Sequence, residues 1–153
     1  MITPEQFQLL LPLACKWAEQ QEISIQQNGI GLTHSQIEDA TRVGVKYPEK
    51  VKLLQVSTIP IPEEPALASA TQATQLITTN TVGLTLRYGI FVRSDYWNNR
   101  QILVHELVHT SQYERLGGIL PFLQKYLTEC ISIGYPAAPM EQEAIRIASE
   151  ITT

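Results

Sequence analysis

The chain is poor in the residues that bind transition metals and form crosslinks. Its 153 residues contain three histidines and two cysteines. Cys15 and Cys130 are far apart and form no C-x-x-C pair, which argues against a disulfide scaffold or a thiolate metal site. We expect two buried free thiols, with a single disulfide between them as the alternative.

Charge is also scarce, and no basic run is present. Charged residues make up 17% of the chain, and the net charge is −4. Nucleic acids and anionic membranes bind through clustered lysines and arginines. The composition therefore argues against both as partners.

Long apolar runs are missing as well. No stretch approaches the roughly 20 apolar residues that span a bilayer. The apolar stretch over residues 9–14 is interrupted by Pro12 and has no basic residues before it, so it is not typical of a signal peptide. We expect a cytoplasmic protein. Hydrophobic residues make up 44% of the chain, which is enough for one domain with a real core.

The first helix is predicted from a capping pattern. In Thr3-Pro4-Glu5-Gln6, Thr3 is the expected N-cap, and Gln6 completes a capping box. The helix is predicted to end near Gln21. Apolar residues at helical spacing within it are predicted to be core rather than a groove for a partner. They are Phe7, Leu10, Leu11, Ala14, Trp17 and Ala18.

The remaining pattern predicts more helices and little sheet. Residues 81–92 alternate apolar and polar side chains around Tyr88-Gly89, which predicts a hairpin or one strand with a glycine bulge. Helices dominate elsewhere, so the expected class is α+β. Further helices are predicted from Thr33 or Ser35 to about Gly44 and over 66–77, 119–131 and 139–151, with a strand over 51–61.

The most informative motif uses two of the three histidines. His105-Glu106-Leu107-Val108-His109 is a complete H-E-x-x-H in an apolar segment with Asn98-Asn99 before it and Gly117-Gly118 after it, so a helix is expected. Residues four apart share a helix face, so both imidazoles can bind one Zn²⁺ at about 2.0–2.1 Å. Glu106 then lies where it can accept a proton from a zinc-bound water.

The alternative without a metal site is an amphipathic helix that carries two solvated or core-capping histidines. Polar groups in so apolar a helix need partners, which favours a metal. A catalytic zinc has three protein ligands and an open position. His34, Glu129, Glu141 and Glu143 are the candidates for the third ligand, and the residues alone leave all four open.

Two segments of the chain carry a resemblance to a known family. H-E-x-x-H-x-x-Q at residues 105–112 and P-x-E-x-E-A at 139–144 resemble the small gluzincin metallopeptidases. More narrowly, they are similar to bacterial zincin-like domains of unknown function. The match covers residues 81–148. It implies a single zincin-like domain over 1–153, with a central H-E-x-x-H helix, an N-terminal part of helices and strand over 1–80 and a metal-site part over 81–153.

The resemblance also implies a third ligand. In the wider group an E-x-x-A-D or E-x-x-A-N helix supplies it through its first glutamate, which corresponds to Glu141 here. Glu143 is the second choice, as a contact to a histidine ring or to the metal. Ile145 stands where the group often has Asp or Asn, so a partner for a ligand histidine is either absent or comes from elsewhere.

The expected function is zinc-dependent hydrolysis of a peptide or protein substrate, with Glu106 as general base. Tyr135 and Arg146 are candidate donors to the oxyanion. By resemblance, residues 88–93 are expected to be an edge strand that pairs with an extended substrate. A domain of this size is expected to have a shallow cleft.

Three other interpretations remain open. One is a catalytically inactive zinc-binding interaction module. Another is a structural zinc with a fourth protein ligand, taken from Glu143, His34 or Cys130. The last is no metal at all. Glu106 favours the enzyme, because a structural site has no use for a base. The oligomeric state is not predicted.

Overall fold

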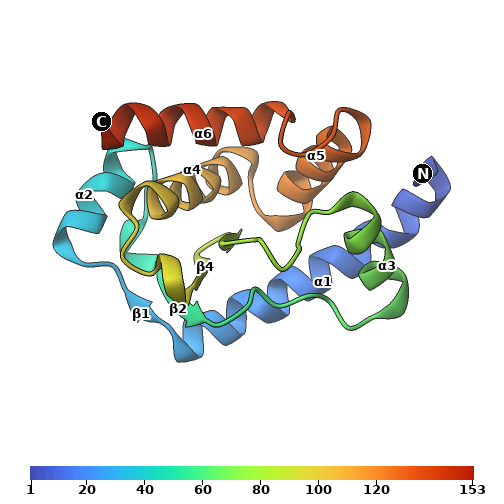
Figure 1. The fold of residues 1–153 in the computed structure, drawn as a ribbon, viewed down its shortest axis with the longest axis horizontal. Helices are drawn as coiled ribbons and strands as arrows, with labels where there is room; N and C mark the ends of the chain where they lie inside the picture. Colours follow the sequence, from blue (N-terminus) through green and yellow to red (C-terminus); the bar gives the residue numbers. More distant parts are fainter.

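A computed structural model describes residues 1–153 and confirms the α+β class, with six α-helices and one mixed four-stranded sheet. The elements stack in layers (Figure 1). Helix α6 (Pro139–Thr152) packs on α4 (Arg100–Leu116), and α4 covers one face of the sheet. Helix α1 (Pro4–Asn28) covers the other face. The helix that carries the H-E-x-x-H motif therefore lies in the middle of the molecule.

The sheet has the order β1-β2-β4-β3. Strand β2 (Lys52–Val56) pairs antiparallel with β1 (Ile30–Gly31) and parallel with β4 (Gly89–Arg93). Strand β3 (Gly83–Leu86) pairs antiparallel with β4 alone, so β3 is an edge of the sheet. The parallel pairing needs a long crossover, which contains α3 (Pro65–Thr74).

The expectation that residues 88–93 form an edge strand is wrong. Strand β4 occupies these residues and is hydrogen-bonded on both sides, to β2 and to β3. Alternating side chains identify a strand but carry no information about its neighbours. The free edge belongs to β3, the strand before the turn.

Of the two alternatives for residues 81–92, the structure has the hairpin. Its turn residue Arg87 has a φ of 62°, a left-handed conformation that non-glycine residues adopt reluctantly. The carboxylate of Glu22 holds this turn. It accepts hydrogen bonds from Arg87 Nε and Nη2 at 2.7–3.1 Å and from the Tyr88 amide at 3.0 Å. Buried Glu22 thereby ties α1 to the hairpin.

The first helix is longer than its pattern predicts. It begins with the expected capping box of Thr3 and Gln6 but continues past Gln21 to Asn28, because Glu22 and Ile25 keep burying the same face. The predicted strand over 51–61 shrinks to β2, and the residues after it lead to the prolines before α3. The other helices are close to expectation, with α2 at His34–Arg42 and α5 at Ile119–Ser132.

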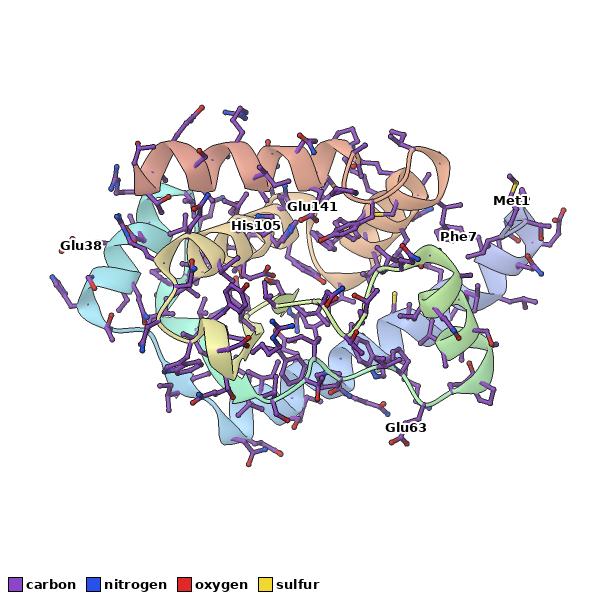
Figure 2. All side chains as sticks on the ribbon, viewed as in Figure 1. Met1, Phe7, Glu38, Glu63, His105 and Glu141 are labelled. Atoms are coloured by element: carbon purple, nitrogen blue, oxygen red, sulfur yellow. The ribbon has the colours of Figure 1, made fainter.

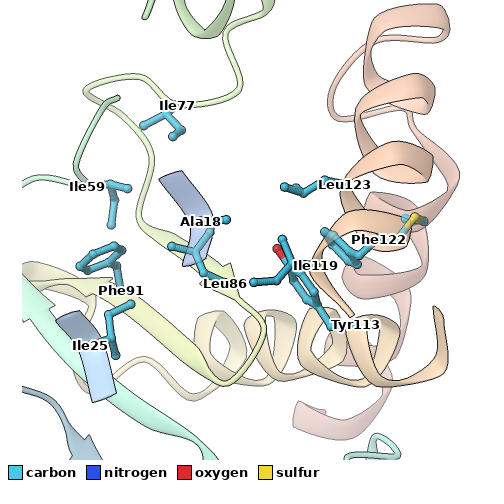
Figure 3. Packing of buried hydrophobic residues seen from close by; sticks show 11 residues of the cluster. Ala18, Ile25, Ile59, Ile77, Leu86, Phe91, Tyr113, Ile119, Phe122 and Leu123 are labelled. Carbon is cyan, nitrogen blue, oxygen red and sulfur yellow. The ribbon is translucent and has the colours of Figure 1, made fainter. Parts of the chain in front are cut away.

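Two apolar clusters hold these layers together. The larger joins α1, β3, β4, α4, α5 and α6 (Figure 3), and in it the rings of Tyr113 and Phe122 stack with centroids 3.5 Å apart. The smaller lies between the sheet, α2 and α4. Cys15 and Cys130 are both free, but only Cys130 is buried as expected, and Cys15 is half-buried. None of the helices combines the length and the apolar character needed to cross a membrane.

Candidate metal centre

Helix α4 holds the motif rigidly because both of its ends are capped. The Asn99 side chain accepts a hydrogen bond from the Ile102 amide at 3.0 Å, and Gly117 closes the helix with a φ of 102°. The predicted start and stop of this helix are confirmed. Its apolar face is buried by the sheet and by α6, so the motif histidines cannot be simple solvated residues.

The structure brings Glu141 to the two motif histidines. Glu141 lies in the first turn of α6, and its side chain meets His105 between the two helices (Figure 2). Glu141 Oε1 is 2.7 Å from His105 Nε2, and Glu141 Oε2 is 3.2 Å from His109 Nε2. One ligand atom from each of the three residues lies within 4.8 Å of the others. Glu141 is only 2% exposed.

This set of atoms can hold a metal ion. Two imidazole nitrogens and one carboxylate oxygen form the donor set of many three-ligand catalytic sites. Ligands of a tetrahedral ion with bonds of about 2.0–2.1 Å lie about 3.3 Å apart. The 2.7 Å contact between His105 and Glu141 is therefore a direct hydrogen bond, which a small opening of the side chains converts into ligation.

The protein environment favours the charged forms of Glu141 and His109. Burial opposes charge on His109 most strongly, but the hydrogen bonds to Glu141 and Gln112 and the negative charges of Glu141 and Glu106 together outweigh it and raise the pKa of His109 to about 9. Burial also disfavours the Glu141 carboxylate, yet the two histidines hold its pKa well below the usual range. Glu141 is therefore an anion at neutral pH, as a ligand must be.

Gln112 orients His109 from the next turn of the same helix. Its Oε1 lies 2.8 Å from His109 Nδ1. Its Nε2 donates to the Met140 carbonyl at 3.0 Å and to Glu143 Oε1 at 2.9 Å. Because the amide nitrogen is committed to two acceptors, its oxygen must accept from His109, which leaves Nε2 of that ring facing Glu141. Gln112 thus provides the polar partner for a candidate ligand histidine that Ile145 cannot provide.

Tyr126 of α5 contacts the same carboxylate. Its hydroxyl donates to Glu141 Oε2 at 2.7 Å, and its ring packs edge-on against His109 with centroids 5.7 Å apart. Burial and the nearby Glu141 charge raise the pKa of Tyr126, so it is a neutral donor. Oε2 of Glu141 thus contacts both Tyr126 and His109, whereas Oε1 contacts His105 alone. Oε1 is therefore the oxygen with more room to bind a metal ion.

Glu106 points to the edge of the sheet. Its Oε1 accepts a hydrogen bond from the Thr85 hydroxyl at 2.7 Å, and its Oε2 lies 4.0 Å from His105 Nε2. It is 6% exposed. A β-carbon at Gly83 would lie 3.0 Å from Glu106 Cγ, so only glycine fits here without displacing the carboxylate. Strand β3 therefore holds Glu106 beside His105, one of the two candidate ligand histidines.

The other candidates for the third ligand lie outside the cluster. His34 is exposed and pairs with Glu38 at 3.0 Å. Glu129 accepts from the Met140 amide at 2.9 Å and so positions the start of α6. Glu143 contacts Gln112 rather than a histidine ring. Glu129 and Glu143 therefore contact residues that surround the site and not the candidate ligands themselves.

The two candidate oxyanion donors differ in position. Tyr135 is 45% exposed and lines the same cavity as Glu106 and Glu141. Arg146 is exposed, pairs with Glu150 at 3.4 Å and is absent from the cavity wall. Of the two, only Tyr135 lines the cavity at the candidate metal centre.

The site opens into a cavity of about 150 Å³. Side chains of α1 and α3 form the wall of this cavity opposite His109 and Glu141. The resemblance covers only residues 81–148, so it gave no hint that the N-terminal part builds this second wall.

Sequence reasoning missed Gln112, Tyr126 and Thr85 as parts of the site. Gln112 had a signal, because residues three apart on a helix are neighbours and it lies three residues after His109. Tyr126 and Thr85 reach the cluster only through tertiary packing. Comparisons with protein-family models, with curated proteins and with solved structures find no match to this chain.

Proposed function

We propose that this protein is a zinc-dependent metallopeptidase of the zincin type. The observation that carries the proposal is the conjunction of two features. His105, His109 and Glu141 form a three-residue donor set, and Glu106 lies beside it with Oε2 4.0 Å from His105 Nε2, which supports a role as general base.

Two imidazoles and a carboxylate are a ligand set of catalytic zinc, and zinc held by His105, His109 and Glu141 would supply a Lewis acid and an acidified water. With such an ion in place, Glu106 would be the residue that accepts the proton of the attacking water and returns it to the leaving amine. Its bond to Thr85 keeps Oε1 in place, while Oε2 faces the ligands. Tyr135 donates to the oxygen of the attacked carbonyl from the same cavity.

Strand β3 supplies the edge along which an extended peptide aligns. The Thr85 carbonyl accepts a hydrogen bond from the Tyr113 hydroxyl at 3.1 Å, so it faces away from β4. Peptide groups alternate along a strand, so Gly83 also faces outward, and it lies directly over Glu106. A peptide that pairs at Gly83 brings its own carbonyl close to the base and the ligands.

The test is hydrolysis of an unfolded protein substrate by zinc-loaded wild type and by Glu106→Gln. We expect peptide products from the wild type alone, with equal zinc content in both proteins, because Glu106 is a base rather than a ligand. Glu150→Gln, a matched change at an exposed position, should cleave like wild type. Equal turnover in Glu106→Gln refutes the base assignment, and zinc binding without turnover in the wild type favours the inactive module.

A further inference from the structure

The apolar face of α1 packs against the larger core cluster, as its spacing predicts, but most of it is not fully buried. Only Ala18 of that face is buried, and the others are half-buried. Helix α3 lies across from them, with Leu67 and Ala70 on its inner face. Four of the α1 side chains line the cavity together with Ala18: Phe7, Leu10, Ala14 and Trp17.

This cavity is continuous with the candidate metal centre and is otherwise mostly apolar. Glu106, His109 and Glu141 are part of its wall, while most of the remaining lining is hydrophobic. Its volume is about 150 Å³. An apolar cavity of about this volume admits a benzene-sized group, which suits one large side chain and not a long hydrocarbon chain. The edge of β3 at Gly83 borders the same cavity, and its outward peptide groups can pair with those of a bound peptide.

We propose that this cavity, built by the N-terminal helices, binds one large apolar side chain, phenylalanine or leucine, of a peptide whose backbone pairs with β3. The inference rests on the proposed function for the identity of the reaction. A charged side chain is excluded because the cavity wall away from the metal cluster offers almost no polar partner for it. Burial of a large apolar side chain favours the peptide that carries it by about ten-fold or more.

The chain contains a built-in reporter for binding. It has two tryptophans, Trp17 in the cavity wall and Trp97 against the second apolar cluster. Trp97→Phe therefore leaves Trp17 as the only indole. The probes are acetyl-Gly-Gly-Phe-Gly-Gly-amide and the same peptide with aspartate in place of phenylalanine, titrated into zinc-free and zinc-loaded protein.

We expect a saturable shift of Trp17 emission with the phenylalanine peptide and at least ten-fold weaker binding of the aspartate peptide. Ala70→Phe fills the cavity and should weaken binding of the phenylalanine peptide by about ten-fold. Ala66→Phe makes the same change on the exposed face of α3 and should leave binding unchanged. If Ala70→Phe lacks a native unfolding transition, Ala14→Leu fills the cavity from α1 and should act in the same way.

The cavity assignment and the metallopeptidase proposal can each be refuted without the other. Binding of the phenylalanine peptide by zinc-free protein supports the cavity assignment even where no hydrolysis is found. In an active enzyme, cleavage sites mapped by mass spectrometry should lie beside phenylalanine and leucine and lose that preference in Ala70→Phe. Equal binding of both peptides, or unaltered binding and cleavage in the cavity-filled variants, overturns the cavity assignment and leaves the metallopeptidase proposal standing.

Discussion

Gln112 Oε1 lies 2.8 Å from Nδ1 of His109, and this contact determines which ring nitrogen faces Glu141. Both residues are on α4, within one turn of each other. The amide of Gln112 is fully buried and is itself held by the Met140 carbonyl and by Glu143. The orientation of His109 is thus set by a residue of its own helix. Helix α6, which supplies Glu141, holds that residue in place through Met140 and Glu143.

Gln112→Leu should weaken zinc binding by about 10–100-fold, because His109 loses the acceptor that holds its tautomer. The measurement is a competition titration with a chromophoric zinc chelator. Gln112→Glu keeps the acceptor for His109 but turns a second oxygen toward the Met140 carbonyl and Glu143, so it should recover only part of the affinity. Gln101→Leu, at an exposed position of the same helix, is the matched control. An unaltered affinity in Gln112→Leu would show that His109 needs no such partner.

Gly83→Ala should reduce hydrolysis by about 100-fold while zinc stays bound. The added methyl group would lie 3.0–3.1 Å from the side chain of Glu106 and push the carboxylate away from the ligands. Initial rates and zinc content are measured on the same preparation. Gly31→Ala in β1 has its nearest neighbour 3.7 Å away at the end of the flexible Lys52 side chain and serves as the control. Full activity in Gly83→Ala contradicts the close approach of β3 to the base.

The stability of the zinc-free protein should depend on pH through Glu141 and His109. The pKa of His109 is raised from 6.5 to about 9, so its contribution is complete below pH 6.5 and disappears as the pH rises through 9. The pKa of Glu141 is lowered from 4.5, so its contribution is complete above pH 4.5 and is lost on acidification. Urea unfolding in the presence of a chelator should show greatest stability between pH 4.5 and 6.5.

Glu141→Gln should flatten both limbs of that profile, whereas Glu150→Gln, exposed on the same helix, should leave its shape unchanged. An alkaline limb that persists unaltered in Glu141→Gln would mean that other groups cause it.

Glu22→Ala should lower the free energy of unfolding by about 2 kcal/mol, since Arg87 and the Tyr88 amide lose a shared, largely buried acceptor. Arg87 is partly exposed, so the loss is smaller than for a fully buried pair. Glu19→Ala, exposed on the same helix, is the control for urea unfolding. A loss equal to that of the control would show that the hairpin turn is stable without Glu22.

Local patterns predicted the parts of the site that lie close together in sequence. His105, Glu106 and His109 are separated by one helical turn, so their shared position follows from helix geometry. Caps at Asn99 and Gly117 are equally local and were predicted correctly. Glu141 lies 36 residues from His105, and only the resemblance singled it out among four candidates.

Features that depend on packing between distant segments could not be predicted from local sequence patterns. The edge position of β3 depends on the parallel pairing of β2 with β4, which no short pattern encodes. The apolar spacing of α1 correctly marked an inward face, but a spacing cannot tell a filled core from a cavity wall. Tyr126 reaches Glu141 from another helix, and its sequence context is that of an ordinary packed aromatic.

The most direct test of the metal centre is the zinc content of the purified protein by mass spectrometry, for wild type, Glu141→Ala and Glu143→Ala. We expect about one zinc per chain in the wild type, retention in Glu143→Ala and loss in Glu141→Ala, because only Glu141 offers its oxygens to both histidines. Absence of zinc from the wild type after reconstitution, or loss in Glu143→Ala alone, would contradict the proposed metal centre.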